Sequence, residues 1–312
     1  MRPAVFLGAK GVYMNYRAKR KMAGYAFLLP SFFFLACFLL YPFCKSVVMS
    51  FTNWVGSSDK WEFVGVRNYV DLIGNKKYWN AILINLKFAL ISTFIQTVLG
   101  FLLAYAVYNM SQRWQSFYKV ALYLPVILPA SVIAVMWRFL LSAQTGLVNT
   151  ILRGIGLGNL AHGWVGEKAT ALGTIIFVNT WQYIGFTMVL FYIAMQNISL
   201  DVLESAEVDG ANKFHKLIHF FIPMTVGTTE TNVILSVTGG MKSFALFYML
   251  TGGGPGNATK VVSMLIYETA FKEFKFYRAL SMAAVLFVII LVLTLISRYL
   301  GDRYNYENDN GR

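Results

Sequence analysis

Six long apolar runs constrain what this chain can fold into more than any other feature. A helix needs about 20 apolar residues to cross the ~30 Å hydrocarbon core of a bilayer. Charged residues make up only 13% of the 312-residue chain, about half the share usual in soluble domains. The pattern therefore predicts an all-α fold, a polytopic membrane helix bundle of about six transmembrane helices. The six runs are Tyr25–Met49, Ala81–Tyr108, Val120–Leu141, Ala171–Met195, Val226–Leu250 and Leu280–Ile296.

Two of the later runs contain helix-breaking residues. The third run holds Pro125 and Pro129, and the fifth holds Thr238, Gly239, Gly240 and Lys242. Broken backbone is tolerated at membrane depth where neighbouring helices or a wet cavity satisfy the freed polar groups. We therefore expect the third and fifth runs to lie in the protein interior rather than against lipid.

The charge distribution predicts the topology and the domain boundaries. Residues 1–23 form a basic segment, with six basic side chains and no acid in the first 21 residues, which places the N-terminus in the cytoplasm. We predict no cleaved signal peptide. A transmembrane domain over 24–300 and a C-terminal tail over 301–312 on the cytoplasmic side would follow. Four basic residues of the last outer loop run against this rule: Lys260, Lys272, Lys275 and Arg278.

The segment 197–223 falls on the cytoplasmic side of this topology and has the pattern of a helix-turn-helix. Ser199 is placed to cap a first helix, with Asp201 in its first turn, and Gly210 is suited to end that helix. A second helix would run to Pro223. Its apolar positions follow helical spacing: Phe214, Leu217, Ile218 and Phe221. This segment is either an ordinary solvated loop or a docking element for a partner.

The same segment resembles the EAA loop of ATP-binding-cassette importer permeases. Glu204-Ser205-Ala206, three intervening residues, Gly210, nine intervening residues and then Phe220-Phe221-Ile222-Pro223 follow the spacing of that motif. Ser205, Phe220 and Ile222 are mild departures from the family pattern. Further positions resemble the carbohydrate branch of the family, which includes the maltose-importer membrane subunits: Trp137, Gly146, Asn149, Leu250–Pro255, Thr259, Tyr267, Ala270 and Phe271.

This resemblance implies a non-catalytic permease subunit in a bacterial cell membrane, forming half of a path for a sugar. The implied partners are a second permease subunit, two ATPase subunits, an extracytoplasmic solute-binding protein, the sugar and membrane lipid, with no nucleic acid. The chain itself would hold no cofactor or metal, because ATP and Mg would bind to the ATPase subunits. The residues implied to couple the permease to the ATPases are Glu204, Ala206, Asp209, Gly210, Phe214 and Pro223.

Polar and aromatic residues gather in the fourth and fifth runs. Asn179, Trp181 and Asn232 belong to this group. From chemistry alone the group could line a wet sugar path or pack helices together. The resemblance assigns sugar contacts to seven positions: Gln182, Tyr183, Phe186, Ser236, Gly239, Gly240 and Ser243. The two glycines replace larger family residues, which would give a roomier site.

Other interpretations stay open at this stage. Uptake of glycerol phosphate would need a cation within the membrane, for which Lys242 is the candidate. A membrane-embedded enzyme would need buried acids, and Glu230 is one of few. His215 and His219 have the spacing of two metal ligands on one helix face, and Glu204, Glu207 and Asp209 could form a carboxylate cluster. A channel would need no docking loop.

Overall fold

The computed structural model describes residues 9–56 and 60–310, and this part of the chain is helical apart from loops and one isolated antiparallel bridge between Thr52 and Phe63. The α-helices in chain order are α1 (Ala9–Leu35), α2 (Tyr41–Met49), α3 (Arg67–Ile73), α4 (Lys76–Tyr108), α5 (Gln112–Ile127), α6 (Ala130–Leu140), α7 (Leu147–Gly154), α8 (Ala171–Gln196), α9 (Leu200–Val208), α10 (Lys213–Lys216), α11 (Ile222–Met224), α12 (Val226–Met241), α13 (Ala245–Leu250), α14 (Val262–Tyr267) and α15 (Phe276–Asn310). The π-helical stretches are Ala36–Leu40, Leu217–Phe221 and Glu268–Lys272, and Gly158–Leu160 forms a 3₁₀ turn.

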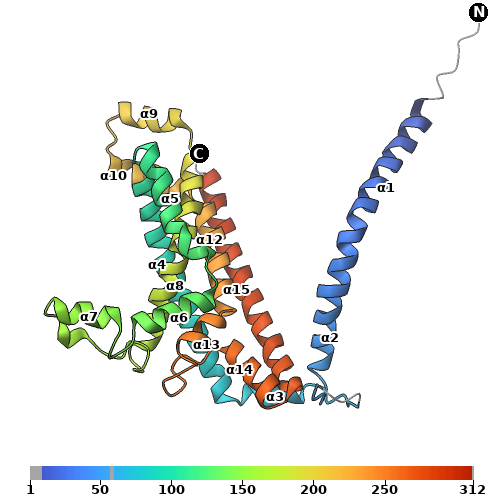
Figure 1. The fold of residues 1–312 in the computed structure, drawn as a ribbon. Coiled ribbons are helices and arrows are strands. Elements are labelled where there is room, and N and C mark those ends of the chain that lie inside the picture. The colour runs from blue at the N-terminus through green and yellow to red at the C-terminus, as the bar shows by residue number, and fades with distance from the viewer. Residues whose placement is uncertain (1–8, 57–59, 311–312) are drawn as a thin grey trace, which may run out of the picture.

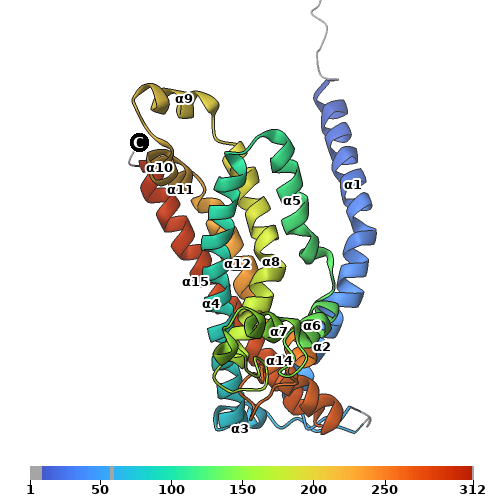
Figure 2. The same cartoon turned by 60° about the vertical axis from the view of Figure 1, so that its left-hand side comes forward.

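The core is a bundle in which α4, α8, α12 and α15 run beside one another (Figures 1 and 2). Small residues let these helices approach closely. A Cβ added at Gly100 of α4 would lie 2.5 Å from a side-chain carbon of Thr187 on α8, and one at Gly240 of α12 would lie 2.9 Å from Ala89 on α4. The all-α membrane bundle predicted from the apolar runs is therefore confirmed.

The number of uninterrupted spans is smaller than the six apolar runs suggest. Within the described residues, four helical segments are long and apolar enough to cross a membrane: Gly24–Met49, Lys76–Tyr108, Ala171–Gln196 and Phe276–Gly301. The third run is instead two helices, α5 and α6, which meet at an angle of 97° after Leu128. The fifth run gives α12, whose 16 residues extend ~24 Å, short of the ~30 Å hydrocarbon core.

The interior position predicted for the two broken runs holds for α12 and for α6, where Ile133 and Ala134 are buried, but not for α5. In α12, Asn232, Val237, Gly240 and Met241 are buried against neighbouring helices. In α5 no residue is buried within this chain. The proline at the break makes α6 turn away, so α5 packs along α8 on a single side and leaves its other side open.

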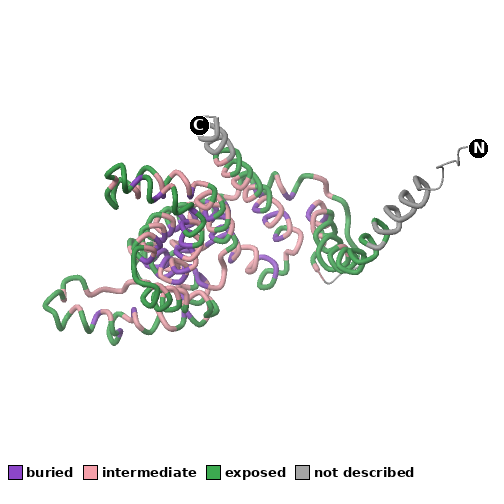
Figure 3. Tube along the Cα trace, turned by 90° about the horizontal axis from the view of Figure 1, so that it is seen from above, coloured by how far each residue is buried: buried purple, intermediate pink, exposed green. Residues whose placement is uncertain are grey.

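The first span stands apart from the bundle. Figure 3 shows that the buried residues are concentrated in the core and that the first span is exposed where its burial is drawn. The most apolar stretch of Gly24–Met49 contains no buried residue. Its contact with the core lies at α2, where the rings of Phe43 and Phe287 are 5.1 Å apart. Helix α1 runs without a break through the predicted boundary at residue 23, and α15 runs through the one at 300. Residues 1–8 and 311–312 of the predicted terminal segments lie outside the described residues.

Candidate functional site

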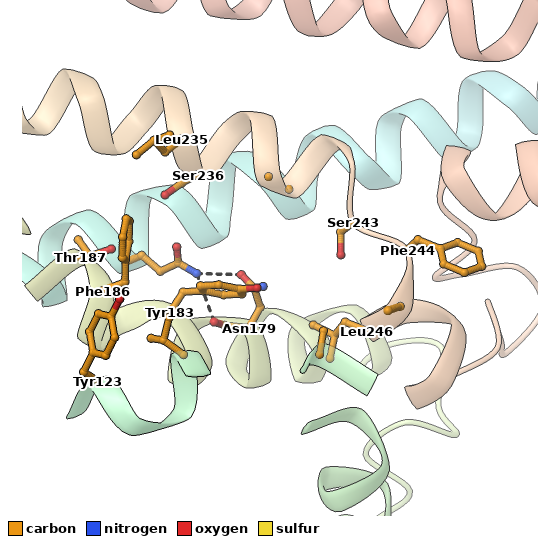
Figure 4. A pocket seen from close by; sticks show the side chains of 16 residues that line it. Tyr123, Asn179, Tyr183, Phe186, Thr187, Leu235, Ser236, Ser243, Phe244 and Leu246 are labelled. Carbon is orange, nitrogen blue, oxygen red and sulfur yellow. Dashed lines mark hydrogen bonds between the residues drawn. The ribbon is translucent and has the colours of Figure 1, made fainter. Parts of the chain in front are cut away.

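A cavity of about 460 Å³ lies halfway along the bundle, between α5, α8, α12 and α13. Two helix breaks create it. The chain turns at Leu128–Pro129 between α5 and α6, and again at Lys242–Phe244 between α12 and α13. Figure 4 shows side chains from both sides of the cavity directed into the space between these helices.

The lining combines ring faces with uncharged polar groups. Tyr123 of α5 and Tyr183 and Phe186 of α8 supply aromatic surface, and the hydroxyls of Ser236 and Ser243 face them from the α12 side (Figure 4). The amides of Asn179 and Gln96 also line it, joined by a 2.8 Å hydrogen bond from Gln96 Nε2 to Asn179 Oδ1. None of the 16 lining residues carries a charge. Such a surface suits a neutral ligand that offers both hydroxyls and apolar faces.

Six of the seven predicted path residues line this cavity: Tyr183, Phe186, Ser236, Gly239, Gly240 and Ser243. Gln182 does not. Its side chain is buried, and Nε2 donates to the carbonyl of Leu128 at 3.1 Å. That carbonyl lies at the break before Pro129, where the continuing helix no longer supplies a partner. Gln182 therefore supports the bend.

The two glycines of α12 differ in the free space beside them. A Cβ at Gly239 would meet nothing within 4 Å, so the roomier site that was predicted fits this position. At Gly240 the vacated space is filled by Ala89 of α4. Gly240 therefore brings two helices together and adds no room.

Several buried amides that do not line the cavity hold the helices around it together. Asn232 is fully buried, donates to Thr97 Oγ1 at 2.9 Å and accepts from Thr187 Oγ1 at 3.1 Å, so it joins α12 to α4 and α8. Asn85 was missed by the sequence reasoning. Its Nδ2 lies 3.2 Å from the carbonyl oxygen of Gly240, and its Oδ1 accepts from the amide of Val262 at 2.8 Å. A lone asparagine within an apolar run was the available signal.

The segment 197–223 forms the predicted hairpin at one end of the bundle (Figure 1). Helix α9 ends at Val208, and Gly210 follows with φ +85°, the left-handed conformation expected of a helix-ending glycine. Ser199 occupies the N-cap position of α9 but its side chain makes no capping hydrogen bond, whereas the Asn212 side chain caps α10 by accepting from the amide of His215. Pro223 lies in the first turn of α11 and does not end the helix, which continues to Met224.

An aromatic contact attaches the hairpin to α4. The buried ring of Phe221 packs against the rings of Tyr105 and Tyr108, with centroids 5.1 and 5.2 Å away. Tyr105 Oη also donates to the carbonyl of Lys213 at 2.6 Å. On α9, Leu203 and Ala206 are buried. Leu203 packs with Phe221 in the core cluster, whereas Ala206 faces a small hollow inside the hairpin that Ala211 and Phe220 also line.

The outer surface of the hairpin is apolar at several points. Val208 is 88% exposed and Phe214 is 69% exposed. The predicted stripe on the second helix is divided, because the π-helical stretch Leu217–Phe221 changes the helical period and turns Phe221 inward while Phe214 and Ile218 stay exposed. Glu204 and Asp209 are exposed as well.

An ion pair crosses the hairpin. The Lys216 ammonium donates to Glu207, which links α10 to α9. This hydrogen bond, together with the positive charge, holds the pKa of the Glu207 carboxyl below its ordinary value. The Glu207 carboxylate therefore has a structural role, because its ion pair with Lys216 joins the two halves of the hairpin. His215 and His219 stack with their ring centroids 4.0 Å apart.

A multi-pass bundle with an uncharged polar cavity at mid-depth and a hairpin beyond its end defines a membrane transport subunit. Residues 96–306 match the family described as binding-protein-dependent transport system inner membrane component. The chain belongs to this family, and the match includes both the cavity and the hairpin. The predicted identity as a permease subunit of an ATP-binding-cassette importer, a class that is not itself catalytic, is confirmed.

Known proteins resemble the chain over nearly its whole length. The probable ABC transporter permease protein YurN of Bacillus subtilis is 33% identical, over 89% of this chain and 95% of the relative. The probable starch degradation products transport system permease protein AmyD of Thermoanaerobacterium thermosulfurigenes is 28% identical, over 90% of this chain and 94% of the relative. A crystal structure of a bacterial ABC transporter involved in alginate import contains a chain of the same fold, with a TM-score of 0.81, 23% identity, and coverage of 93% and 99% of the two chains.

Proposed function

We propose that the chain forms half of a translocation path for a neutral sugar or oligosaccharide, with the cavity between α5, α8, α12 and α13 as its sugar site. The observation that carries this proposal is the lining, which pairs aromatic rings with hydroxyl and amide groups and includes no charge. Sugars present hydroxyls that need hydrogen bonds and ring faces that pack on aromatics. The printed name of the AmyD relative, which refers to starch degradation products, supports the same substrate class.

The placement of Lys242 argues against a phosphorylated substrate in this cavity. Lys242 is exposed at the end of α12 and does not line the space. Glu230, the acid considered for an embedded enzyme, does not line it either. A phosphate buried there would lose its hydration without gaining an ion pair, which is energetically costly.

The hairpin is proposed to dock onto an ATPase subunit. Its exposed apolar residues Val208 and Phe214 lie at the end of the bundle, beyond the spans, where a protein partner is needed to cover them. Glu204 and Asp209 would bond to that partner, while Gly210 shapes the turn between the helices. Ala206 and Pro223 would act from within, by packing and by fixing the second helix.

The rest of the assembly follows from these two roles. A second permease subunit would complete the path, a solute-binding protein would deliver the sugar from outside, and two ATPase subunits would bind ATP and Mg. The hairpin end, and with it the C-terminus, would then be cytoplasmic. The N-terminus would be on the same side, as the basic residues before the first span predict.

The cavity can be tested by uptake of radiolabelled maltotriose through the complete importer. Tyr183→Ala, Ser236→Ala and Ser243→Ala should each lower uptake at subsaturating sugar while leaving assembly and ATP hydrolysis intact. Each lost hydrogen bond is worth about 0.5–1.5 kcal/mol, up to roughly tenfold in affinity. Tyr118→Ala and Ser116→Ala are matched controls, since both residues are on α5 but outside the lining. Normal uptake by all three cavity variants would move the sugar site elsewhere.

A further inference from the structure

The end of α4 opposite the hairpin carries a lysine where a membrane helix should be apolar. The exposed face of α4 is a stripe of large apolar side chains that includes Leu83, Leu90, Ile91, Phe94 and Val98. Lys87 is exposed too, and its position four residues after Leu83 and four before Ile91 places it within this stripe. It lies 11 residues from the start of the helix, or ~16 Å along the axis, a depth from which a lysine can reach the headgroup level.

Lys87 borders a hollow of about 630 Å³ between α4, the start of α8, the loop before α14 and α14 itself. Three further lysines and two glutamates line the hollow, along with the amides of Asn80 and Asn257 and apolar side chains. The charged lining residues are Lys77, Lys87, Lys168, Lys260, Glu268 and Glu273. The hollow is therefore basic at its polar end and continuous with an apolar stripe along α4.

The acids of the hollow are already paired. Glu268 accepts from Lys260 at 2.7 Å and has Lys272 at 3.6 Å. Glu273 is bonded to Lys275 at 2.9 Å. Among the described residues no acidic side chain lies within ion-pair distance of Lys87 or Lys168. An unpaired cation on a membrane helix is costly, so Lys87, with Lys168 in the loop beside it, points to an anion that is supplied from elsewhere.

We infer that this hollow binds the phosphate headgroup of an anionic phospholipid, with the acyl chains lying along the Leu90–Val98 face of α4. Lys87 and Lys168 would contact the phosphate, and Asn80 and Asn257 would bond to the glycerol part. Of the four basic residues that run against the charge rule for topology, Lys260 lines this hollow. The choice of membrane leaflet rests on the proposed function. If the hairpin is cytoplasmic, the hollow lies at the opposite end of α4 and faces the outer leaflet.

The assembled importer, purified in neutral detergent, provides the test. Native mass spectrometry would measure binding of phosphatidylglycerol and of phosphatidylcholine to the unchanged protein and to the double variant Lys87→Gln, Lys168→Gln. We expect the double variant to lose phosphatidylglycerol affinity at least tenfold and Lys87→Arg to keep it. Lys45→Gln is the matched control, since Lys45 is also exposed on a membrane helix but lies outside the hollow. Phosphatidylcholine should bind weakly throughout.

Three results would overturn the inference. Equal phosphatidylglycerol binding by the double variant would show that the lysines do not hold the headgroup. Displacement of the lipid by millimolar glycerol 1-phosphate would indicate a site for a free anion. Protection of the introduced thiol of Leu90→Cys from a lipid-soluble maleimide that persists in the Lys87→Gln, Lys168→Gln double variant of the assembled importer would show that a protein partner, and not the lipid, covers the stripe. Maltotriose uptake is read separately, so a lipid result leaves the sugar proposal untouched.

Discussion

Glycine serves different purposes in the cavity-bearing core and in the hairpin. In the core, Gly185 of α8 lies against α5 so closely that an added Cβ would be 1.9 Å from the carbonyl oxygen of Leu122. In the hairpin, Gly210 has nothing within 4 Å of such a Cβ but holds φ at +85°. The core therefore depends on close approach between helices, and the hairpin depends on one backbone conformation at an open turn.

The largest expected effect is from Gly185→Ala, which forces α5 and α8 apart. Overpacking of this kind costs about 1–3 kcal/mol, and here the obstacle is backbone that cannot rotate away. Thermal unfolding of the purified importer, followed by size-exclusion chromatography, should show a clear loss of stability. Gly173→Ala is the matched control on the same helix, with nothing within 4 Å, and should be neutral or slightly stabilising. Equal behaviour of the two variants would contradict the close contact.

A smaller effect, confined to coupling, is expected at Gly210. Gly210→Val would cost about 1–2 kcal/mol in the left-handed conformation without any clash inside this chain. The variant should lose ATPase subunits on purification or hydrolyse ATP without driving uptake. Gly210→Asn should retain much of the coupling, because asparagine tolerates positive φ. If valine leaves subunit retention, hydrolysis and uptake unchanged, the turn conformation does not matter for docking.

The hairpin was more accessible to sequence reasoning than the core. Its turn and its two helices follow from local signals, namely a helix-ending glycine and apolar spacing between Ser199 and Pro223. The role of Gln182 could not be found this way, because its partner is the Leu128 carbonyl, 54 residues earlier in the chain. The 97° turn at Pro129 and the contact at Gly185 likewise depend on which helices become neighbours. Apolar periodicity gives the face that is buried but does not identify the helix that buries it.

The smallest expected effect concerns pH and the Glu207–Lys216 pair on the exposed hairpin. The pKa of Glu207 is held below its ordinary value of 4.5 by the lysine. A carboxyl with a lowered folded pKa stabilises the fold at pH above the unfolded value, and the contribution is lost as pH falls through the folded value. Hydrogen exchange across 207–216, corrected for intrinsic rate, should therefore accelerate below about pH 4.5 in the unchanged protein.

Two variants sharpen that measurement. In Glu207→Gln the acid-dependent step should disappear, and protection of 207–216 at neutral pH should already equal the low-pH level. Glu204 is on the same helix, and its carboxylate makes no ion pair in the described structure. The pH dependence of exchange in Glu204→Gln should therefore match that of the unchanged protein. The effect is expected to be modest and weakened by salt, because the Glu207 side chain is 62% exposed. A step that persists in Glu207→Gln would assign the acid sensitivity of the hairpin to another carboxyl, and Asp209, exposed beside Gly210, would be the next to replace.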